Sequence, residues 1–133
     1  MGCGTGVCMT VPNEGNTRGP VCGCDGLTYW NTSVAAHRGM SVKTTGVCTS
    51  SVTCGGIAAI DCPGNAFCNY EADISYCSIS DPGGNCWVMP STCPTPGIGF
   101  GPRTRACGAP TCGYECQLIK AQTPFSVDTT CPQ

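Results

Sequence analysis

Residues 20–31 read PVCGCDGLTYWN. Asp25-Gly26 favours a tight turn, and Leu27-Thr28-Tyr29 after it has the β-branched and aromatic residues typical of a strand. Asn31-Thr32-Ser33 offers N-cap residues for a short helix, and Gly39 is a natural stop for it. The stretch therefore predicts a turn, a strand and a capped helix in quick succession.

Cysteine dominates the composition around this stretch. The chain has 15 cysteines in 133 residues, with 11% charged residues, 19 Gly and 11 Pro. This cysteine content exceeds the roughly 8–10% that marks a disulfide scaffold. Aromatic residues make up only 7% of the chain, so a large apolar core is not expected. We expect a small disulfide-rich fold stabilised by cross-links, each worth about 2–4 kcal/mol.

The same composition excludes several classes of protein. No apolar run approaches the ~20 residues of a membrane span. Six Lys and Arg residues, spread thinly against eight Asp and Glu, do not suit nucleic-acid binding. With one histidine and no base–nucleophile pattern, we expect no enzyme and no cofactor. The paired CxxC spacing of a zinc ribbon is absent, so we expect disulfides and no metal.

Disulfides indicate an oxidising compartment, so we expect a secreted, extracellular protein. Met1-Gly2-Cys3 opens directly into the cysteine-rich region, which predicts that this form lacks a signal peptide.

Two segments of the chain share a cysteine pattern. In each, two cysteines lie 14 positions apart: Cys8 and Cys22, and Cys93 and Cys107. Ser33 lies 15 positions before Cys48, as Cys116 lies 15 before Cys131. Ser33 therefore stands where the other copy has a cysteine, which accounts for the odd count.

The repeat divides the chain into units at residues 1–48, 54–77 and 86–131. The outer units each predict one short helix, over residues 34–38 and 115–122, and a strand, over residues 42–45 and 125–128. We expect residues 27–29 to pair with the strand at 42–45, and residues 78–85 to form a connector. In the middle unit the cysteine spacings of 8, 6 and 9 favour Cys54–Cys68 and Cys62–Cys77, one of three possible pairings.

The stretch PVCGCDGLTYWN, followed by the helix, Gly39 and the closing Gly46-Val47-Cys48, resembles the signature of Kazal-type domains. Cys24 resembles the extra cysteine of bacterial cysteine-rich variants. The middle CGGIAAIDCPGNAFC resembles a module that often precedes such domains. The segment at 86–131 is similar mainly in its spacing. The resemblance implies two Kazal-like units, each with one short helix and a small antiparallel sheet, flanking a cysteine-rich hairpin module.

The resemblance also implies a disulfide pairing. The family's pattern gives Cys22–Cys48, Cys107–Cys131, Cys93–Cys116, Cys3–Cys24 and Cys86–Cys112. Cys8 is then left without a partner. It would form an intermolecular disulfide or a reactive thiol, or it marks a tolerated loss or a Cys→Ser change at position 33.

Kazal domains typically inhibit serine proteases through a loop after the second cysteine, so the resemblance implies an extracellular serine protease as partner. The loop would be Met9-Thr10-Val11, with Thr10 as specificity residue and Asn31 as the asparagine that braces it. Thr95 has this place in the last unit. Threonine suits the small pocket of a subtilisin- or elastase-like protease.

Features of the chain also favour a second class, a structural subunit of an extracellular fibre, coat or matrix. Both loops have 13 residues between their cysteines, longer than the family's usual, and Pro96 directly follows Thr95. Tandem cross-linked units, low charge and an unpaired cysteine suit self-assembly, with copies of the chain as partners.

Overall fold

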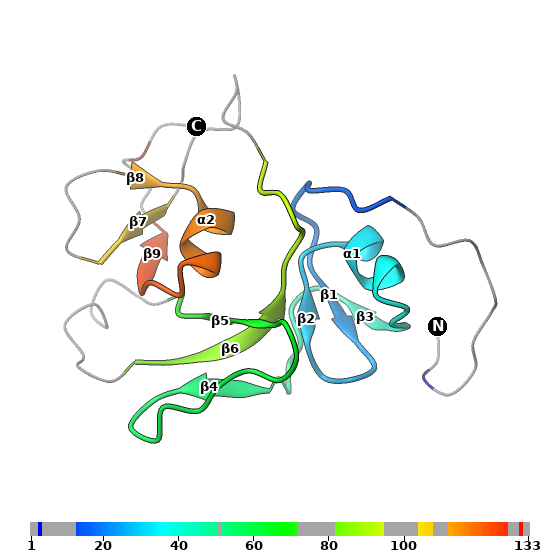
Figure 1. Ribbon diagram of the computed structural model, residues 1–133, viewed down its shortest axis with the longest axis horizontal. Helices are drawn as coiled ribbons and strands as arrows, with labels where there is room; N and C mark the ends of the chain where they lie inside the picture. Colours follow the sequence, from blue (N-terminus) through cyan, green and yellow to red (C-terminus); the bar gives the residue numbers. More distant parts are fainter. Residues whose placement is uncertain are drawn as a thin grey trace.

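The computed structural model describes residues 3, 13–50, 52–71, 82–94, 104–107, 112–127 and 131. Short strands and two short helices follow one another along the chain (Figure 1). In chain order they are β1 (Val21–Gly23), β2 (Thr28–Tyr29), α1 (Thr32–His37), β3 (Val42–Thr45), β4 (Thr53–Gly55), β5 (Phe67–Asn69), β6 (Gly83–Val88), β7 (Thr104–Ala106), β8 (Cys112–Gly113), α2 (Glu115–Lys120) and β9 (Phe125–Val127). The expected class, a small disulfide-rich protein with small sheets and few helices, is confirmed.

The larger sheet gathers strands from all three expected units. Its order is β3-β1-β2-β6-β4, and β5 also pairs with β6. β6 runs parallel to β2, with Thr28 beside Trp87, and antiparallel to β4 and β5. Units that the sequence separates at 1–48, 54–77 and 86–131 are therefore joined through one strand.

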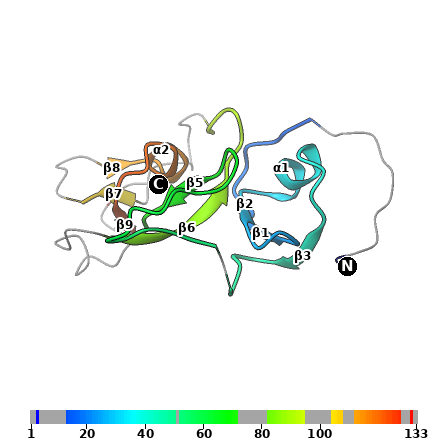
Figure 2. The same cartoon turned by 60° about the horizontal axis from the view of Figure 1, so that its bottom comes forward.

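The smaller sheet belongs to the last unit. Its order is β8-β7-β9, all antiparallel. An isolated bridge between Glu71 and Phe125, and a bond from the Phe125 amide to the Tyr70 carbonyl, tie β9 to the segment after β5. α2 packs on β5, and both helices lie on the same side of the strands (Figure 2).

The buried core continues from one unit to the next. Val34 of α1, Ile119 of α2 and Phe125 of β9 are all fully buried. Trp30 and Trp87 belong to the same buried cluster, with ring centroids 6.2 Å apart. Because few large apolar side chains are available, one continuous cluster lets each of them pack against more than one unit.

Both expected helices are present, with ends that lie within two residues of the predicted 34–38 and 115–122. Asn31 is the N-cap of α1, and Gly39 follows its C-terminus with φ +70°. α2 ends at Lys120, and Gln122 turns the chain with φ +52° before Pro124. Strand predictions at 42–45 and 125–128 agree with β3 and β9 to within one residue.

The expected pairing of residues 27–29 with the strand at 42–45 is wrong. β1 lies between them, bonded to β2 on one side and β3 on the other. The Asp25-Gly26 turn therefore closes a hairpin of β1 and β2, since a short turn brings together the strands directly beside it.

The expected connector at 78–85 is also wrong at its end, because Gly83 to Asn85 belong to β6. A Cβ atom at Gly84 would lie 2.4 Å from the Asn69 carbonyl oxygen. Gly84 therefore permits close approach of a neighbouring strand and does not mark a turn.

We expect Gly84→Ala to lower the free energy of unfolding by about 1–3 kcal/mol, because β5 and β6 must separate to admit the methyl group. Gly83→Ala is the matched control, since its Cβ would have no neighbour closer than 3.8 Å. Urea denaturation of both variants measures the difference. Equal loss in the two variants would show that close approach at Gly84 is not the reason for glycine.

Several expected disulfides are present. The pairs that agree with the expectation are Cys3–Cys24, Cys22–Cys48, Cys54–Cys68 and Cys93–Cys116. Cys8 and Cys77 lie outside the described residues.

The expected pairs Cys62–Cys77 and Cys86–Cys112 are wrong, because Cys62 bonds to Cys86. The spacing argument treats the middle unit as self-contained. β6 instead inserts between β4 and β5 and sets Cys86 opposite Cys68, beside the loop that carries Cys62. The disulfide then joins the middle unit to the last one.

The expected pair Cys107–Cys131 is wrong as well, because Cys131 bonds to Cys112. Cys107 is in a different disulfide. In the smaller sheet, Ala106 pairs with Phe125 and Thr104 with Val127. Cys107 thus follows one end of β7, while Cys131, which follows Val127, lies at the other end beside β8.

Candidate functional site

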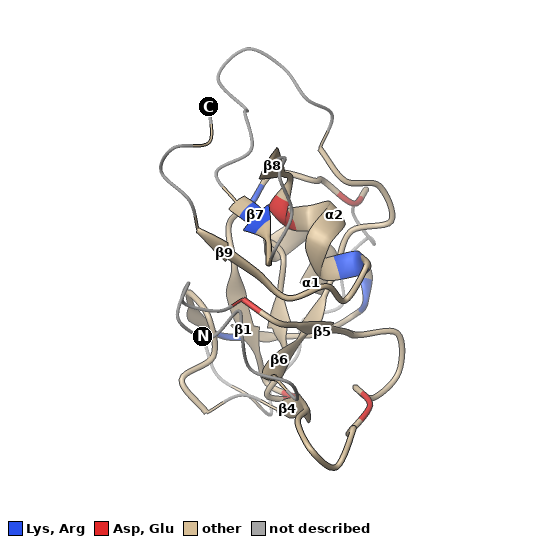
Figure 3. Ribbon diagram, turned by 90° about the vertical axis from the view of Figure 1, so that its left-hand side faces the viewer, with Lys and Arg blue, Asp and Glu red and all other residues tan. Residues whose placement is uncertain are grey.

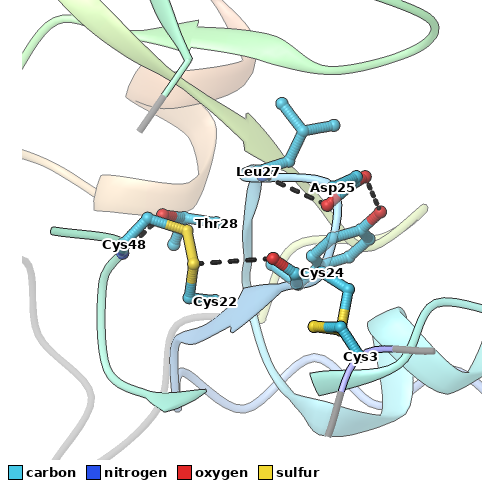
Figure 4. The surroundings of a disulfide bond; sticks show 9 residues. Cys3, Cys22, Cys24, Asp25, Leu27, Thr28 and Cys48 are labelled. Carbon is cyan, nitrogen blue, oxygen red and sulfur yellow. Dashed lines mark hydrogen bonds between the residues drawn. A yellow bond between two sulfur atoms is a disulfide. The ribbon is translucent and has the colours of Figure 1, made fainter. Parts of the chain in front are cut away.

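The turn at Asp25 and Gly26 is fixed by one carboxylate. Gly26 has φ +82°, and its amide donates to the Gly23 carbonyl at 3.0 Å. Asp25 accepts from the Leu27 amide at 3.1 Å and from the Tyr29 hydroxyl at 2.7 Å (Figure 4). Burial, and then the bond to Asp25, hold the pKa of Tyr29 far above its usual range. Tyr29 therefore stays a proton donor, and the turn is rigid.

Beyond this hairpin, Asn31 uses both polar atoms of its side chain. Its Oδ1 caps α1 by accepting from the Val34 amide at 2.8 Å, and it also accepts from the Ser33 hydroxyl at 2.7 Å. Its Nδ2 donates to the Gly15 carbonyl at 3.0 Å and to the Thr17 carbonyl at 2.8 Å. One side chain thus ties the start of α1 to the chain that precedes β1.

Ser33 closes the same network. Its Oγ accepts from the Gly15 amide at 2.8 Å while donating to Asn31. The repeat predicts only that a cysteine is missing here. The structure gives the hydroxyl at this position a role, since it orients Asn31 and holds Gly15 directly.

Trp30 supplies the remaining contacts to this segment. Its indole Nε1 donates to the Asn16 carbonyl at 2.8 Å, and its own carbonyl accepts from the Gly19 amide at 3.0 Å. Carbonyls at 15, 16 and 17 are therefore all bonded to the body of the protein. We call residues 13–20 the braced segment.

The braced segment is also bonded to the last unit. The Ser91 amide donates to the Glu14 carboxylate, and Arg18 Nε lies 2.6 Å from Glu115 Oε1. Burial alone would raise the pKa of Glu14, but the Ser91 bonds and the charges of His37 and Arg38 lower it, so the carboxylate is ionised at neutral pH. Because the Arg18 side chain is 48% exposed, its ion pair contributes at most about 1 kcal/mol.

Few of these partners are visible in the sequence. The resemblance predicts Asn31 as a brace, and the structure brings it to Gly15 and Thr17. The sequence does not predict Glu14 and Arg18, because nothing local indicates partners 77 and 97 residues away. The expected loop residues lie outside the described part of the chain; they are Met9, Thr10, Val11 and Thr95.

A cluster of sulfur atoms lies in the middle unit. Among the described residues, the Sγ atoms of Cys54, Cys62 and Cys68 lie within 4.8 Å of one another. Each belongs to a disulfide, Cys54–Cys68 or Cys62–Cys86. Since the thiolate is the form of cysteine that binds metals, these sulfur atoms are not metal ligands while they remain in disulfides.

Fold and site together define a small disulfide-rich protein. Its many disulfides fit an extracellular setting, and none of the described helices is long and apolar enough to cross a membrane. No protein-family model, curated protein or solved structure matches the chain significantly.

Proposed function

We propose that the chain is a secreted Kazal-like protein that binds serine proteases through the loop after Cys8. The observation that carries the proposal is the pair of hydrogen bonds from Asn31 Nδ2 to the Gly15 and Thr17 carbonyls. These bonds hold the chain that continues from the expected loop, at the position where the resemblance implies a bracing asparagine.

Rigidity of the braced segment, which follows the expected loop, favours protease binding. A loop that is ordered before binding loses little conformational entropy in the complex. The braced segment is held by Asn31, Ser33 and Trp30, and the β1–β2 hairpin beside it is fixed by Cys22–Cys48 and by Asp25. The chain that follows the expected loop is thus tied to a cross-linked hairpin of the same unit.

The same bonds limit where a protease can dock. Because the carbonyls at 15, 16 and 17 already accept bonds from the protein itself, this part of the backbone is less available to pair with a protease strand. The proposal therefore assigns the contact to residues upstream of Asn13, with Thr10 in a small specificity pocket of a subtilisin- or elastase-like enzyme.

The direct test is a protease panel with subtilisin-like, elastase-like and trypsin-like members. We expect the purified chain to slow the first two, and Thr10→Pro to abolish this, because proline at that position disturbs an extended, substrate-like backbone. Thr95→Pro is the control and should change nothing, since Thr95 already precedes a proline. Absence of inhibition by the unmodified chain across the panel would refute the proposal.

The brace itself can be tested by comparing two substitutions of Asn31. Asn31→Asp keeps the cap acceptor but loses both Nδ2 donors, each worth about 1 kcal/mol, and sets a negative charge beside two carbonyls. We expect protease affinity to fall at least about tenfold, since ~1.4 kcal/mol is a factor of ten.

Asn31→Ser provides the comparison, because serine also caps helices and leaves no charge. It should keep α1 in the circular dichroism spectrum and lose affinity to an intermediate degree. Equal affinity in all three proteins would show that the brace has no part in binding.

A second function, self-assembly into an extracellular structure, is supported by a separate observation. Ile57, Ile60 and Val127 are exposed by 92%, 52% and 58% on a chain with few large apolar residues. Of these, Ile57 and Ile60 lie in one turn, and exposed apolar side chains that gather in one place mark interfaces.

A further inference from the structure

The turn after β4 carries the most exposed of these side chains. We call residues 57–60, Ile57-Ala58-Ala59-Ile60, the apolar turn. Ile57 is 92% exposed and Ile60 is 52% exposed, and both alanines between them are exposed. The segment projects from the lower edge of the molecule next to β4 (Figures 1 and 3). No described part of the chain covers it.

The apolar turn is ordered by its own backbone. Gly55 and Ile60 exchange amide–carbonyl bonds of 2.8 and 3.2 Å, and the Ala59 amide donates to the Gly56 carbonyl at 3.1 Å. Gly55 and Gly56 have φ values of +71° and +72°, which glycine adopts without strain. A partner can therefore bind this protrusion with little loss of conformational entropy.

An open groove of ≈ 410 Å³ lies elsewhere on the molecule, between the C-terminal ends of α1 and α2. Its apolar lining comes from Phe67, Met89 and Pro90, and its charged lining from Arg38 and Lys120. Among the described residues, no acidic side chain lines it, but the Glu14 carboxylate lies beside it, accepting from the Ser91 amide and interacting with the charge of Arg38. The Lys120 ammonium donates to the Ser91 carbonyl at 2.9 Å, which holds the positive charge at the rim.

The charges beside the apolar turn complement those of the groove. Asp61 directly follows Ile60 and is exposed. Two of the chain's six basic residues line the groove, although basic and acidic residues are otherwise few and scattered over the ribbon (Figure 3). The turn offers isoleucine and a carboxylate. The groove offers an apolar floor and the Lys120 ammonium, while the charge of Arg38 is partly offset by Glu14.

We propose that the apolar turn of one copy of the chain binds the groove of a second copy, with Asp61 facing Lys120. This inference rests on the assembly function and not on protease binding, because it uses no residue of the braced segment. Turn and groove are different surfaces, so the contact is head-to-tail and leaves one free turn and one free groove at the ends. Such contacts extend into open chains unless the rotation closes a ring.

Sedimentation velocity over a concentration series tests the proposal. The unmodified chain should form species that grow with concentration. Ile57→Ser should weaken association about 10- to 100-fold, the factor expected from losing one buried isoleucine. Asp61→Lys and Lys120→Glu should each abolish association, because both place like charges at the contact.

The decisive experiment is sedimentation of an equal mixture of Asp61→Lys and Lys120→Glu. The turn that carries Asp61→Lys then meets the groove that carries Lys120→Glu, so a contact of opposite charges forms again with its signs exchanged. The unchanged turn of the second variant likewise meets the unchanged groove of the first, and association should return. Ile57 and Asp61 are exposed and Lys120 is half-buried at the rim of the groove, so the variants are expected to fold, and circular dichroism verifies this.

Three results would overturn the proposal: a monomer at every concentration, association that Asp61→Lys leaves unchanged, or no recovery in the mixture. A covalent dimer on a non-reducing gel would overturn it by assigning the association to an interchain disulfide. Binding of the apolar turn to phosphatidylcholine–phosphatidylserine vesicles by a monomeric chain would overturn it by assigning the turn to a lipid surface. Protease inhibition by Asp61→Lys would be unaffected, because Asp61 lies in the middle unit outside the braced segment and its bonding partners, so failure here is distinguishable from failure of the protease-binding function.

Discussion

Removal of the Cys62–Cys86 disulfide, by Cys62→Ala with Cys86→Ala, is expected to lower the free energy of unfolding by about 2–5 kcal/mol. The bond closes a loop with a sequence separation of 24 and joins the middle unit to β6. Cys86 is fully buried at the centre of the shared sheet. Its loss therefore removes both a chain constraint and packing at the point where the three units meet.

Cys3→Ala with Cys24→Ala is the matched control. Its disulfide has a similar sequence separation of 21, so the loop-closure contribution is similar, but Cys3 is exposed. We expect the control to lose less stability than the Cys62–Cys86 variant in urea denaturation without reductant. Equal losses would mean that packing of Cys86 adds nothing to the constraint on the unfolded chain.

Trp30→Ala is expected to cost about 3–5 kcal/mol, the range for deleting a large buried aromatic side chain. Trp30 is 2% exposed, packs against Trp87 and donates its indole hydrogen to the Asn16 carbonyl. The substitution thus opens a cavity between the first and last units and releases the braced segment at the same time.

Trp30→Phe separates these two effects. Phenylalanine keeps most of the packing and loses the hydrogen bond, so a loss near ~1 kcal/mol is expected, with weaker protease binding. Ile57→Ala is the control for apolar truncation and should change stability by less than about 0.5 kcal/mol, because Ile57 is 92% exposed. Stability of Trp30→Ala equal to that of the unmodified chain would contradict the described packing of the two tryptophans.

Local structure can be predicted from sequence because its causes lie within a few residues. The Asp25-Gly26 turn, the Asn31 cap and the Gly39 stop each depend on one or two side chains and their immediate neighbours. Asn31 is also predicted as a brace, since it lies in the stretch that resembles the Kazal signature.

The sequence-based expectations are wrong where segments far apart in the chain pair with each other. Gly83 and Gly84 have the composition of a turn, yet they form a strand, because glycine is also what two closely packed backbones require. If the residues of β6 are taken as a loop, no cysteine of the middle unit is expected to lie near Cys86. Cys62 is then expected to pair within its own unit, with Cys77. The role of Ser33 is hidden for the same reason, since its partner Gly15 lies 18 residues away.

The central structural claim is that β6 joins the three units, with Cys62–Cys86 as the covalent link. Disulfide mapping of the unreduced chain by mass spectrometry tests this most directly. Cleavage before aspartate and after aromatic residues, at Asp61, Phe67 and Asp81, separates Cys62 from its neighbouring cysteines and Cys77 from Cys86. We predict a peptide pair that links Cys62 to Cys86. A pair that links Cys62 to Cys77, or Cys86 to Cys112, would contradict the account.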